Sequence, residues 1–192
     1  MPLILASASP RRSELLRNAG IPFKVEPAHV PEEASPGETP LIYAQRLARE
    51  KASAVFQRHS NAAVLGADTV VVADEHLLEK PRDREDAVRM LRLLSGRTHQ
   101  VITGVCLIAR AFERTEVEVT QVTFSRLSDD EIAGYVRTGE PMDKAGAYAI
   151  QGMASRWVER IEGCYFNVVG LPVARVYRLM RAAEAATGER LL

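Results

Sequence analysis

The 192-residue sequence has little cysteine, little histidine and no net charge, and each shortage argues against a class of function. The two cysteines, Cys106 and Cys164, form no CxxC pair, which indicates reduced thiols and a cytoplasmic protein. The four histidines lack the spacing of metal ligands, so we interpret them as solvated or structural. Basic and acidic residues balance at 25 each, so nucleic acid and anionic membranes are not expected partners.

Long apolar runs and the common nucleotide-binding loops are absent as well. The apolar stretch before Ser7 is short and has no basic leader, so we expect neither a signal peptide nor a transmembrane span. The sequence contains neither GxxxxGK[ST] nor GxGxxG, which argues against a P-loop and against a Rossmann dinucleotide site. The length suits one sizeable core, and we expect a single domain over residues 1–192.

The most informative feature that is present is a helix start whose charge has the wrong sign. After the strand-like residues 3–6, Ser9 is expected to be the N-cap and Gly20 to follow the helix end, so Arg11 and Arg12 fall in the first turn. Free amide groups and the positive end of the helix dipole favour an anion there. The segment therefore predicts a phosphate site, although two solvated arginines at an exposed helix end would also explain it.

Hydrophobic periodicity and turn residues predict alternating strands and helices along the chain. Strands are expected at residues 3–6, 23–25, 62–73, 101–109, 116–125 and 157–161, and helices at 10–19, 39–58, 83–95, 128–138 and 172–186. The strands at 101–109 and 116–125 are expected to pair antiparallel, and Ser128 with Glu131 forms a capping box. This order indicates an α/β or α+β sheet protein.

Asp68 is a second anomaly, because it lies inside the apolar run AAVLGADTVVVA. A lone ionised carboxylate is costly in such a place unless a metal or hydrogen bonds compensate for it, so Asp68 is a candidate functional residue. Gly66, two residues earlier, would let a ligand or another backbone approach closely. The alternative is a bulge or turn that exposes Asp68 as an ordinary polar residue.

Four further charged residues fit a phosphate or metal site without proving one. Lys51 lies on the apolar stripe of its predicted helix, where a snorkelling lysine is as good an explanation as a functional one. Glu32 and Glu33 lie in a predicted loop, where each carboxylate is either a metal ligand or simply solvated. Lys80 lies in a predicted turn, which either presents its ammonium to phosphate or is merely polar. Together with the arginines and Asp68, these residues suggest phosphoryl chemistry on a polyphosphate with a divalent cation.

Several motifs follow one another along the chain: SASPRR after the first strand, Glu32, REK ending at Lys51, GADT at 66–69, EKP at 79–81, DKAGAYAIQG at 143–152 and NVVGLP at 167–172. In this order they resemble the motifs of the Maf family of nucleotide pyrophosphatases. The resemblance covers nearly the whole chain. It implies a mixed α/β fold like that of inosine triphosphate pyrophosphatases, with a central mixed sheet flanked by helices and two lobes around a cleft. It also implies hydrolysis of a nucleoside triphosphate to the monophosphate and pyrophosphate, aided by Mg²⁺ or Mn²⁺.

The motif DKAGAYAIQG resembles the branch that acts on dTTP and UTP rather than the branch that acts on 7-methyl-GTP. The resemblance implies that Asp68 is the proton acceptor, with Glu32 and Asp68 as candidate metal ligands. The implied specificity positions are Arg11, Thr69 and Gln151, and the implied phosphate-binding positions are Ser7, Arg12, Lys51 and Lys80.

The side chain of Gln151 offers a donor and an acceptor, which complement the N3 hydrogen and a carbonyl of uracil or thymine. A flipped amide would suit cytosine equally well, so neighbouring residues must fix it, and the sequence does not reveal them.

Two other functions compete with hydrolysis of dTTP and UTP. One is a pyrophosphatase for another or a modified nucleotide, such as 7-methyl-GTP, and the other is a non-catalytic nucleotide sensor that regulates cell division. For the enzyme, the expected roles are cell-division arrest or keeping modified nucleotides out of nucleic acids. A homodimer is the expected assembly for a small enzyme.

Overall fold

The structure is a computed structural model that describes residues 1–191 and contains a seven-stranded mixed sheet. Six strands lie in the order β2-β1-β3-β5-β6-β7, and β4 pairs with β3. Strand β1 is parallel to β2 and β3, whereas β4 is antiparallel to β3 and β7 is antiparallel to β6. The strands are β1 (Leu3–Leu5), β2 (Lys24–Val25), β3 (Ala63–Ala73), β4 (His76–Leu78), β5 (Thr98–Ala109), β6 (Phe112–Phe124) and β7 (Val158–Glu162). The predicted α/β class with a central mixed sheet is confirmed.

Helices account for most of the chain between these strands. The α-helices are α1 (Pro10–Asn18), α2 (Pro40–Phe56), α3 (Arg84–Leu94), α4 (Asp129–Arg137), α5 (Tyr165–Val169) and α6 (Val173–Thr187). Three 3₁₀ turns, η1 (Glu140–Asp143), η2 (Ala145–Ala147) and η3 (Met153–Trp157), lie between α4 and β7.

The chain forms two compact units. Unit 1 contains Met1–Asp68, Thr103–Glu118 and the chain from Gly170 onward, and unit 2 contains Thr69–Ile102 and Val119–Val169. Strands β3, β5 and β6 each contribute residues to both units. A single domain over residues 1–192 stays a prediction.

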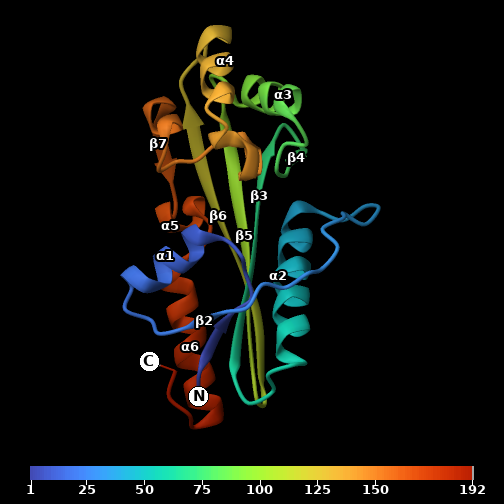
Figure 1. The fold of residues 1–192 in the computed structure, drawn as a ribbon, viewed down its shortest axis with the longest axis vertical. Helices are drawn as coiled ribbons and strands as arrows, with labels where there is room; N and C mark the ends of the chain where they lie inside the picture. The colour runs from blue at the N-terminus through green and yellow to red at the C-terminus, as the bar shows by residue number, and fades with distance from the viewer. Residues whose placement is uncertain (192) are drawn as a thin grey trace. The chain divides into compact units, whose positions relative to one another are not determined.

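In unit 1, helix α2 lies on one side of the strands and helices α1 and α6 lie on the other (Figure 1). Glycines let α2 pack directly on the sheet: a Cβ at Gly66 of β3 would lie 2.1 Å from the carbonyl oxygen of Ala48, and one at Gly104 of β5 would lie 2.2 Å from that of Ala44. Small side chains on α2, such as Ala52, complete this contact in the core. The close approach of backbones that Gly66 predicted is therefore made by α2.

Unit 2 packs helices α3 and α4 together with η1 and η2. Its core holds edge-to-face aromatic contacts in which His99 takes part. The residues concerned are His99, Phe124, Tyr135, Tyr148 and Trp157. Tyr148 directly follows η2 and Trp157 is the last residue of η3, so members of this cluster lie on both sides of the segment between η2 and η3 in the sequence.

The predicted helix starts are confirmed, but some strands were predicted wrongly. Ser9, Thr39, Asp83 and Ser128 are N-caps, and Ser128 with Glu131 makes the capping box. Strand β6 begins at residue 112 rather than 116, because exposed charged residues obscure the alternation of its first half. Strand β4 and helix α5 were missed, since three and five residues are too few to show a period.

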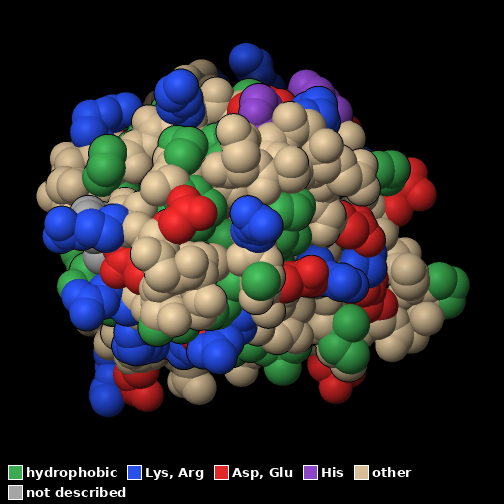
Figure 2. Space-filling view, turned by 90° about the horizontal axis from the view of Figure 1, so that it is seen from below, with side chains coloured by type: hydrophobic (Ala, Val, Ile, Leu, Met, Phe, Trp, Pro, Cys, Tyr) green, Lys and Arg blue, Asp and Glu red, His purple; other side chains and the backbone are tan. Residues whose placement is uncertain are grey.

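The surface reflects the balanced composition. Acidic and basic side chains are interspersed over the face shown in Figure 2. Within residues 1–191, no helix has both the length and the apolar character needed to cross a membrane. Cys106 is buried and Cys164 is partly buried, and both are free thiols.

Candidate active site

The start of helix α1 is built as the sequence predicted, and Arg12 turns back toward the sheet. Ser9 accepts a hydrogen bond from the Arg12 amide, and the first turn contains no acidic residue. The Arg12 guanidinium donates from Nη1 to Ser7 Oγ at 3.0 Å and to the Ala67 carbonyl at 2.9 Å, and from Nε to the Gly170 carbonyl at 2.9 Å. Arg12 therefore joins three segments of unit 1 that are far apart in sequence.

The environment of the Arg12 guanidinium differs from that of an ordinary surface arginine. Desolvation lowers the pKa of Arg12 below its usual value, and the negative charge of Asp68 opposes that shift. The positive charge of Arg11, which is half-buried in the same turn, also acts to lower the pKa of Arg12. The explanation by a solvated side chain is wrong for Arg12, and the first turn of α1 carries concentrated positive charge.

Asp68, Lys51 and Glu32 form the charged centre of unit 1. Asp68 lies in strand β3 and is 7% exposed, so the alternative of an exposed bulge or turn is wrong. Lys51 of α2 is 8% exposed and donates to Asp68 Oδ1 at 2.6 Å. Its Nζ also lies 2.5 Å from Glu32 Oε1. The packing of α2 on Gly66 explains the contact, because it brings the Lys51 turn of the helix against β3.

Opposing effects act on the Asp68 carboxyl. Burial raises its pKa above the usual value, whereas the positive charges of Lys51 and Arg12 act to lower it, and burial is the larger effect. Asp68 thus has a higher proton affinity than an exposed aspartate, in a place from which most water is excluded. This combination suits a group that accepts a proton from a bound water.

Glu32 and Asp68 are the residues that could hold a divalent cation. Both present carboxylate oxygens, the ligands that Mg²⁺ and Mn²⁺ prefer, and both point at the same Lys51 ammonium. Over residues 1–191 there is no group of three or more His, Cys, Asp or Glu side chains arranged to hold a metal. Two carboxylates suit Mg²⁺, which commonly takes its other ligands from water and substrate phosphates.

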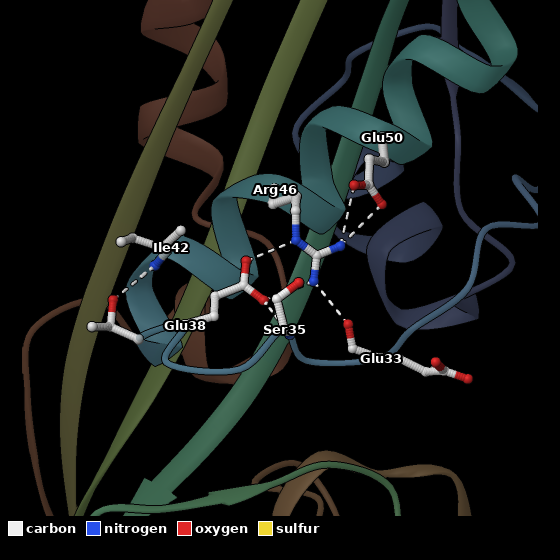
Figure 3. Close-up of polar contacts among 7 residues, drawn as sticks. Glu33, Ser35, Glu38, Ile42, Arg46 and Glu50 are labelled. Carbon is white, nitrogen blue, oxygen red and sulfur yellow. Dashed lines mark hydrogen bonds and ion pairs between the residues drawn. The ribbon is translucent and has the colours of Figure 1, made fainter.

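Arg46 of α2 holds the loop that carries Glu32 (Figure 3). Its guanidinium contacts both oxygens of Glu38 at 2.7 and 2.8 Å, the Glu33 carbonyl at 2.9 Å and Glu50 at 3.1 Å. These contacts lower the pKa of Glu38 to about 2, with the hydrogen bond from Arg46 as the main cause. This cluster was not predicted from the sequence, in which only the four-residue spacing of Arg46 and Glu50 signals it.

The remaining predicted site residues lie on unit 2 or at its boundary. Thr69 directly follows Asp68 in β3 and is half-buried. Lys80 is exposed in the turn after β4, and Gln151 is exposed between η2 and η3. Their roles, like that of Arg11, stay predictions.

Gly146 ties the predicted segments of unit 2 together. Its amide donates to the Glu79 carbonyl at 3.1 Å, which links the segment of Gln151 to the turn of Lys80. A Cβ at Gly146 would lie 2.9 Å from the side chain of Val71 in strand β3. The backbone of the glycine-bearing segment therefore packs against the strand that begins unit 2.

Comparisons with known proteins point in the same direction. The model of the family described as "Maf-like protein" matches residues 2–183. A dTTP/UTP pyrophosphatase of Koribacter versatilis (strain Ellin345) is 67% identical over 183 residues, which cover 95% of each chain. A dTTP/UTP pyrophosphatase of Syntrophomonas wolfei subsp. wolfei is 53% identical, over 92% of this chain and 94% of that one. A dTTP/UTP pyrophosphatase of Aquifex aeolicus (strain VF5) is 44% identical over 98% of both chains.

Proposed function

Since this chain belongs to the Maf family, we propose that it is a pyrophosphatase that hydrolyses dTTP and UTP to the nucleoside monophosphate and pyrophosphate. The relative from Koribacter versatilis, which carries that activity in its name, aligns with 95% of the chain at 67% identity. The structural observation that carries the proposal is the buried Asp68 carboxylate held 2.6 Å from Lys51. A protein that only sensed nucleotides would have little use for a buried proton acceptor.

In the proposed reaction, Asp68 orients a water molecule and takes its proton as the oxygen attacks the α-phosphorus. The bond between the α-phosphorus and the oxygen that bridges to the β-phosphorus breaks, and pyrophosphate leaves. Lys51 keeps the Asp68 carboxylate in place, and Arg12 supplies positive charge fixed by three hydrogen bonds. Fixed cations stabilise the charge that develops in the transition state and require little rearrangement.

Glu32 and Asp68 would hold a divalent cation such as Mg²⁺ or Mn²⁺. When bound, the cation would neutralise part of the negative charge of the triphosphate. Ser7, whose hydroxyl already accepts from Arg12, and the exposed Lys80 are the further phosphate-binding residues in the proposal. Arg11, Thr69 and Gln151 select the nucleotide, and the Gln151 amide complements uracil or thymine.

The decisive experiment is a panel of nucleoside triphosphates, each tested with Mg²⁺ and with Mn²⁺, in which released pyrophosphate is measured. We expect activity on dTTP and UTP that is well above activity on CTP, ATP and GTP. Activity restricted to other or modified nucleotides, with 7-methyl-GTP included in the panel, would replace the proposed substrate. Binding without pyrophosphate release would favour the sensor.

We also propose a cytoplasmic homodimer, with a role in cell-division arrest or in removing modified nucleotides. The free thiols of Cys106 and Cys164 support a reducing compartment. Sedimentation of the purified chain tests the assembly, and a mass at or near 21.2 kDa would contradict it. Overexpression in cells, with division and nucleotide pools as the readouts, tests the role.

A further inference from the structure

Two residues of unit 2 hold the backbone on both sides of Gln151. The Tyr135 hydroxyl oxygen accepts a hydrogen bond at 3.1 Å from the amide of Ala149, two residues before Gln151. The Glu140 carboxylate accepts at 3.1 and 3.4 Å from the amide of Met153, two residues after it. Gln151 is therefore the centre of a five-residue segment that is anchored at both ends.

The two anchors are joined to each other. Tyr135 donates its hydroxyl hydrogen to Glu140 Oε1 at 2.8 Å, so one chain of hydrogen bonds runs from the Ala149 amide to the Met153 amide. Tyr135 is fully buried, and its ring packs edge-to-face on Trp157 with centroids 5.1 Å apart. Burial raises the pKa of Tyr135, which keeps the hydroxyl protonated as a donor. The anchor on the Ala149 side is therefore rigid.

Gly152 allows the anchor on the other side to approach closely. A Cβ at Gly152 would lie 2.1 Å from Glu140 Oε1 and 2.5 Å from Glu140 Cδ. The Glu140 carboxylate thus packs against the backbone of the residue that follows Gln151. Any larger residue at position 152 would displace Glu140 from the Met153 amide.

Base selection by Gln151 depends on where the backbone of this segment holds its side-chain amide. Its side chain is exposed, and a glutamine amide can present either a donor or an acceptor to the same edge of a base. We propose that Tyr135 and Glu140 are positioning residues that fix the Gln151 segment, so that the enzyme prefers uracil and thymine to cytosine. This inference rests on the proposed base-reading role of Gln151.

A purely structural role for the same pair makes a different prediction. If Tyr135 and Glu140 only stabilised unit 2, their loss would lower the melting temperature and leave the choice of base unchanged. If they position Gln151, their loss removes hydrogen bonding to the correct base selectively, because the wrong base never gains the full set. The ratio of kcat/KM for UTP to that for CTP separates the two roles.

The experiment compares Tyr135→Phe, Glu140→Ala and Glu140→Gln with the unaltered chain, using UTP and CTP. We expect Tyr135→Phe and Glu140→Ala each to lower the UTP/CTP ratio about tenfold, mainly through a higher KM for UTP. Glu140→Gln should keep most of the ratio, since its amide oxygen still accepts from Met153. Tyr148→Phe is the matched control, because it removes a buried hydroxyl that bonds His99 rather than the backbone around Gln151. It should leave the ratio unchanged.

Hydrogen exchange of residues 147–153 gives a readout that is independent of activity. The Ala149 amide should exchange faster in Tyr135→Phe, and the Met153 amide faster in Glu140→Ala. Unchanged exchange in both variants would overturn the inference. Should Tyr135→Phe fail to fold, Glu140→Ala and Gly152→Ala carry the same test from the other anchor.

Gln151→Ala, measured in parallel, separates failure of this inference from failure of the proposed function. If Gln151→Ala lowers the UTP/CTP ratio while Tyr135→Phe and Glu140→Ala preserve it, Gln151 reads the base but the two residues do not position it. If Gln151→Ala leaves the ratio unchanged, Gln151 does not read the base, and the positioning role is overturned with it.

Discussion

At the scale of single residues, Asp68 and Lys51 depend on each other. Each side chain is 10% exposed, and neither charge could remain buried at low cost without its partner at 2.6 Å. Such a pair adds little net stability compared with well-packed apolar residues, so its presence is better explained by chemistry. The Glu32 carboxylate on the same ammonium strengthens that explanation, because it gathers two carboxylates at one cation.

Replacing Asp68 tests the proposed proton acceptor. Asp68→Asn keeps the shape and an oxygen for Lys51 but cannot take a proton, so kcat for dTTP should fall at least roughly a hundredfold. Circular dichroism and the melting temperature should show a folded protein. Glu118→Gln is a matched control, since Glu118 is a partly buried carboxylate of unit 1 that pairs with Arg175, and it should keep near-normal turnover. Near-normal turnover in Asp68→Asn would remove Asp68 from this role.

His99 is a buried titratable residue with a structural role. It is 2% exposed, its Nε2 lies 2.9 Å from the Tyr148 hydroxyl, and its Nδ1 has no hydrogen-bond partner in the described part of the chain. Burial lowers its pKa from 6.5 to about 4. The folded protein therefore binds a proton here less readily than the unfolded chain does.

This difference makes stability depend on pH in a known direction. Well above pH 6.5 His99 is neutral in both states, and as the pH falls toward 4 mainly the unfolded chain gains the proton. The free energy of unfolding should therefore drop by about 3 kcal/mol from this residue between pH 7.5 and pH 4. Urea unfolding across that range measures it.

The substitution His99→Gln isolates the contribution from other titrating groups. The stability advantage of the unaltered chain over His99→Gln should shrink as the pH falls. His29→Asn, at an exposed histidine, is the control for replacing a histidine outside the aromatic cluster. A constant difference between the unaltered chain and His99→Gln would contradict the assigned shift.

At the scale of elements, the contact of α2 with β3 determines where Lys51 lies. Gly66 is the contact point, since a Cβ there would be 2.1 Å from the Ala48 carbonyl oxygen and 2.7 Å from the Ala52 amide nitrogen. Backbone atoms of a packed helix cannot move as a flexible side chain can. Gly66→Ala should therefore lower the free energy of unfolding by at least about 2 kcal/mol and reduce activity by displacing Lys51.

Gly134→Ala provides the matched glycine replacement. Gly134 lies inside α4, and the nearest atom to its added Cβ is Arg137 Nη2 at 3.7 Å. Alanine favours a helix over glycine, so this variant should be more stable by roughly 0.5–1 kcal/mol, with unchanged activity. Equal effects of the two replacements in denaturant unfolding would refute the packing argument.

The contact between α2 and the loop before it depends on Arg46. Its fork binds Glu38, whose side chain is 6% exposed, and the Glu33 carbonyl, in a geometry that a lysine cannot reproduce. Arg46→Lys should therefore speed amide exchange of residues 31–38 and lower stability by about 1 kcal/mol. If Glu32 is a metal ligand, the variant should also need more Mg²⁺ for half-maximal activity.

Arg49→Lys is the control on the same helix. Arg49 pairs with Glu113, but their side chains are 63% and 43% exposed, and surface pairs of this kind contribute little. Exchange of residues 31–38 should not change in Arg49→Lys. Equal exchange in the two variants would show that Arg46 does not hold the loop.

At the scale of the whole molecule, the sequence alone determined the features that depend on residues close together along the chain. The N-caps Ser9 and Thr39 each accept from an amide three residues ahead, and such contacts form wherever the local pattern permits. The buried strand β3 followed from its apolar run, and the order of the longer strands and helices followed from periodicity and turn residues. The family resemblance also came from short motifs, because each can be seen without knowing where it lies in space.

Only the tertiary structure decided which of those motifs meet. Arg12 binds carbonyls 55 and 158 residues away, and Lys51 pairs with a carboxylate 17 residues away on another element. The anchors Tyr135 and Glu140 showed no signal in the sequence, since a buried tyrosine and an ordinary glutamate match no motif until the Gln151 segment folds against them. Contacts of this kind depend on strand pairing and on helix packing at Gly66 and Gly104, which no local pattern specifies.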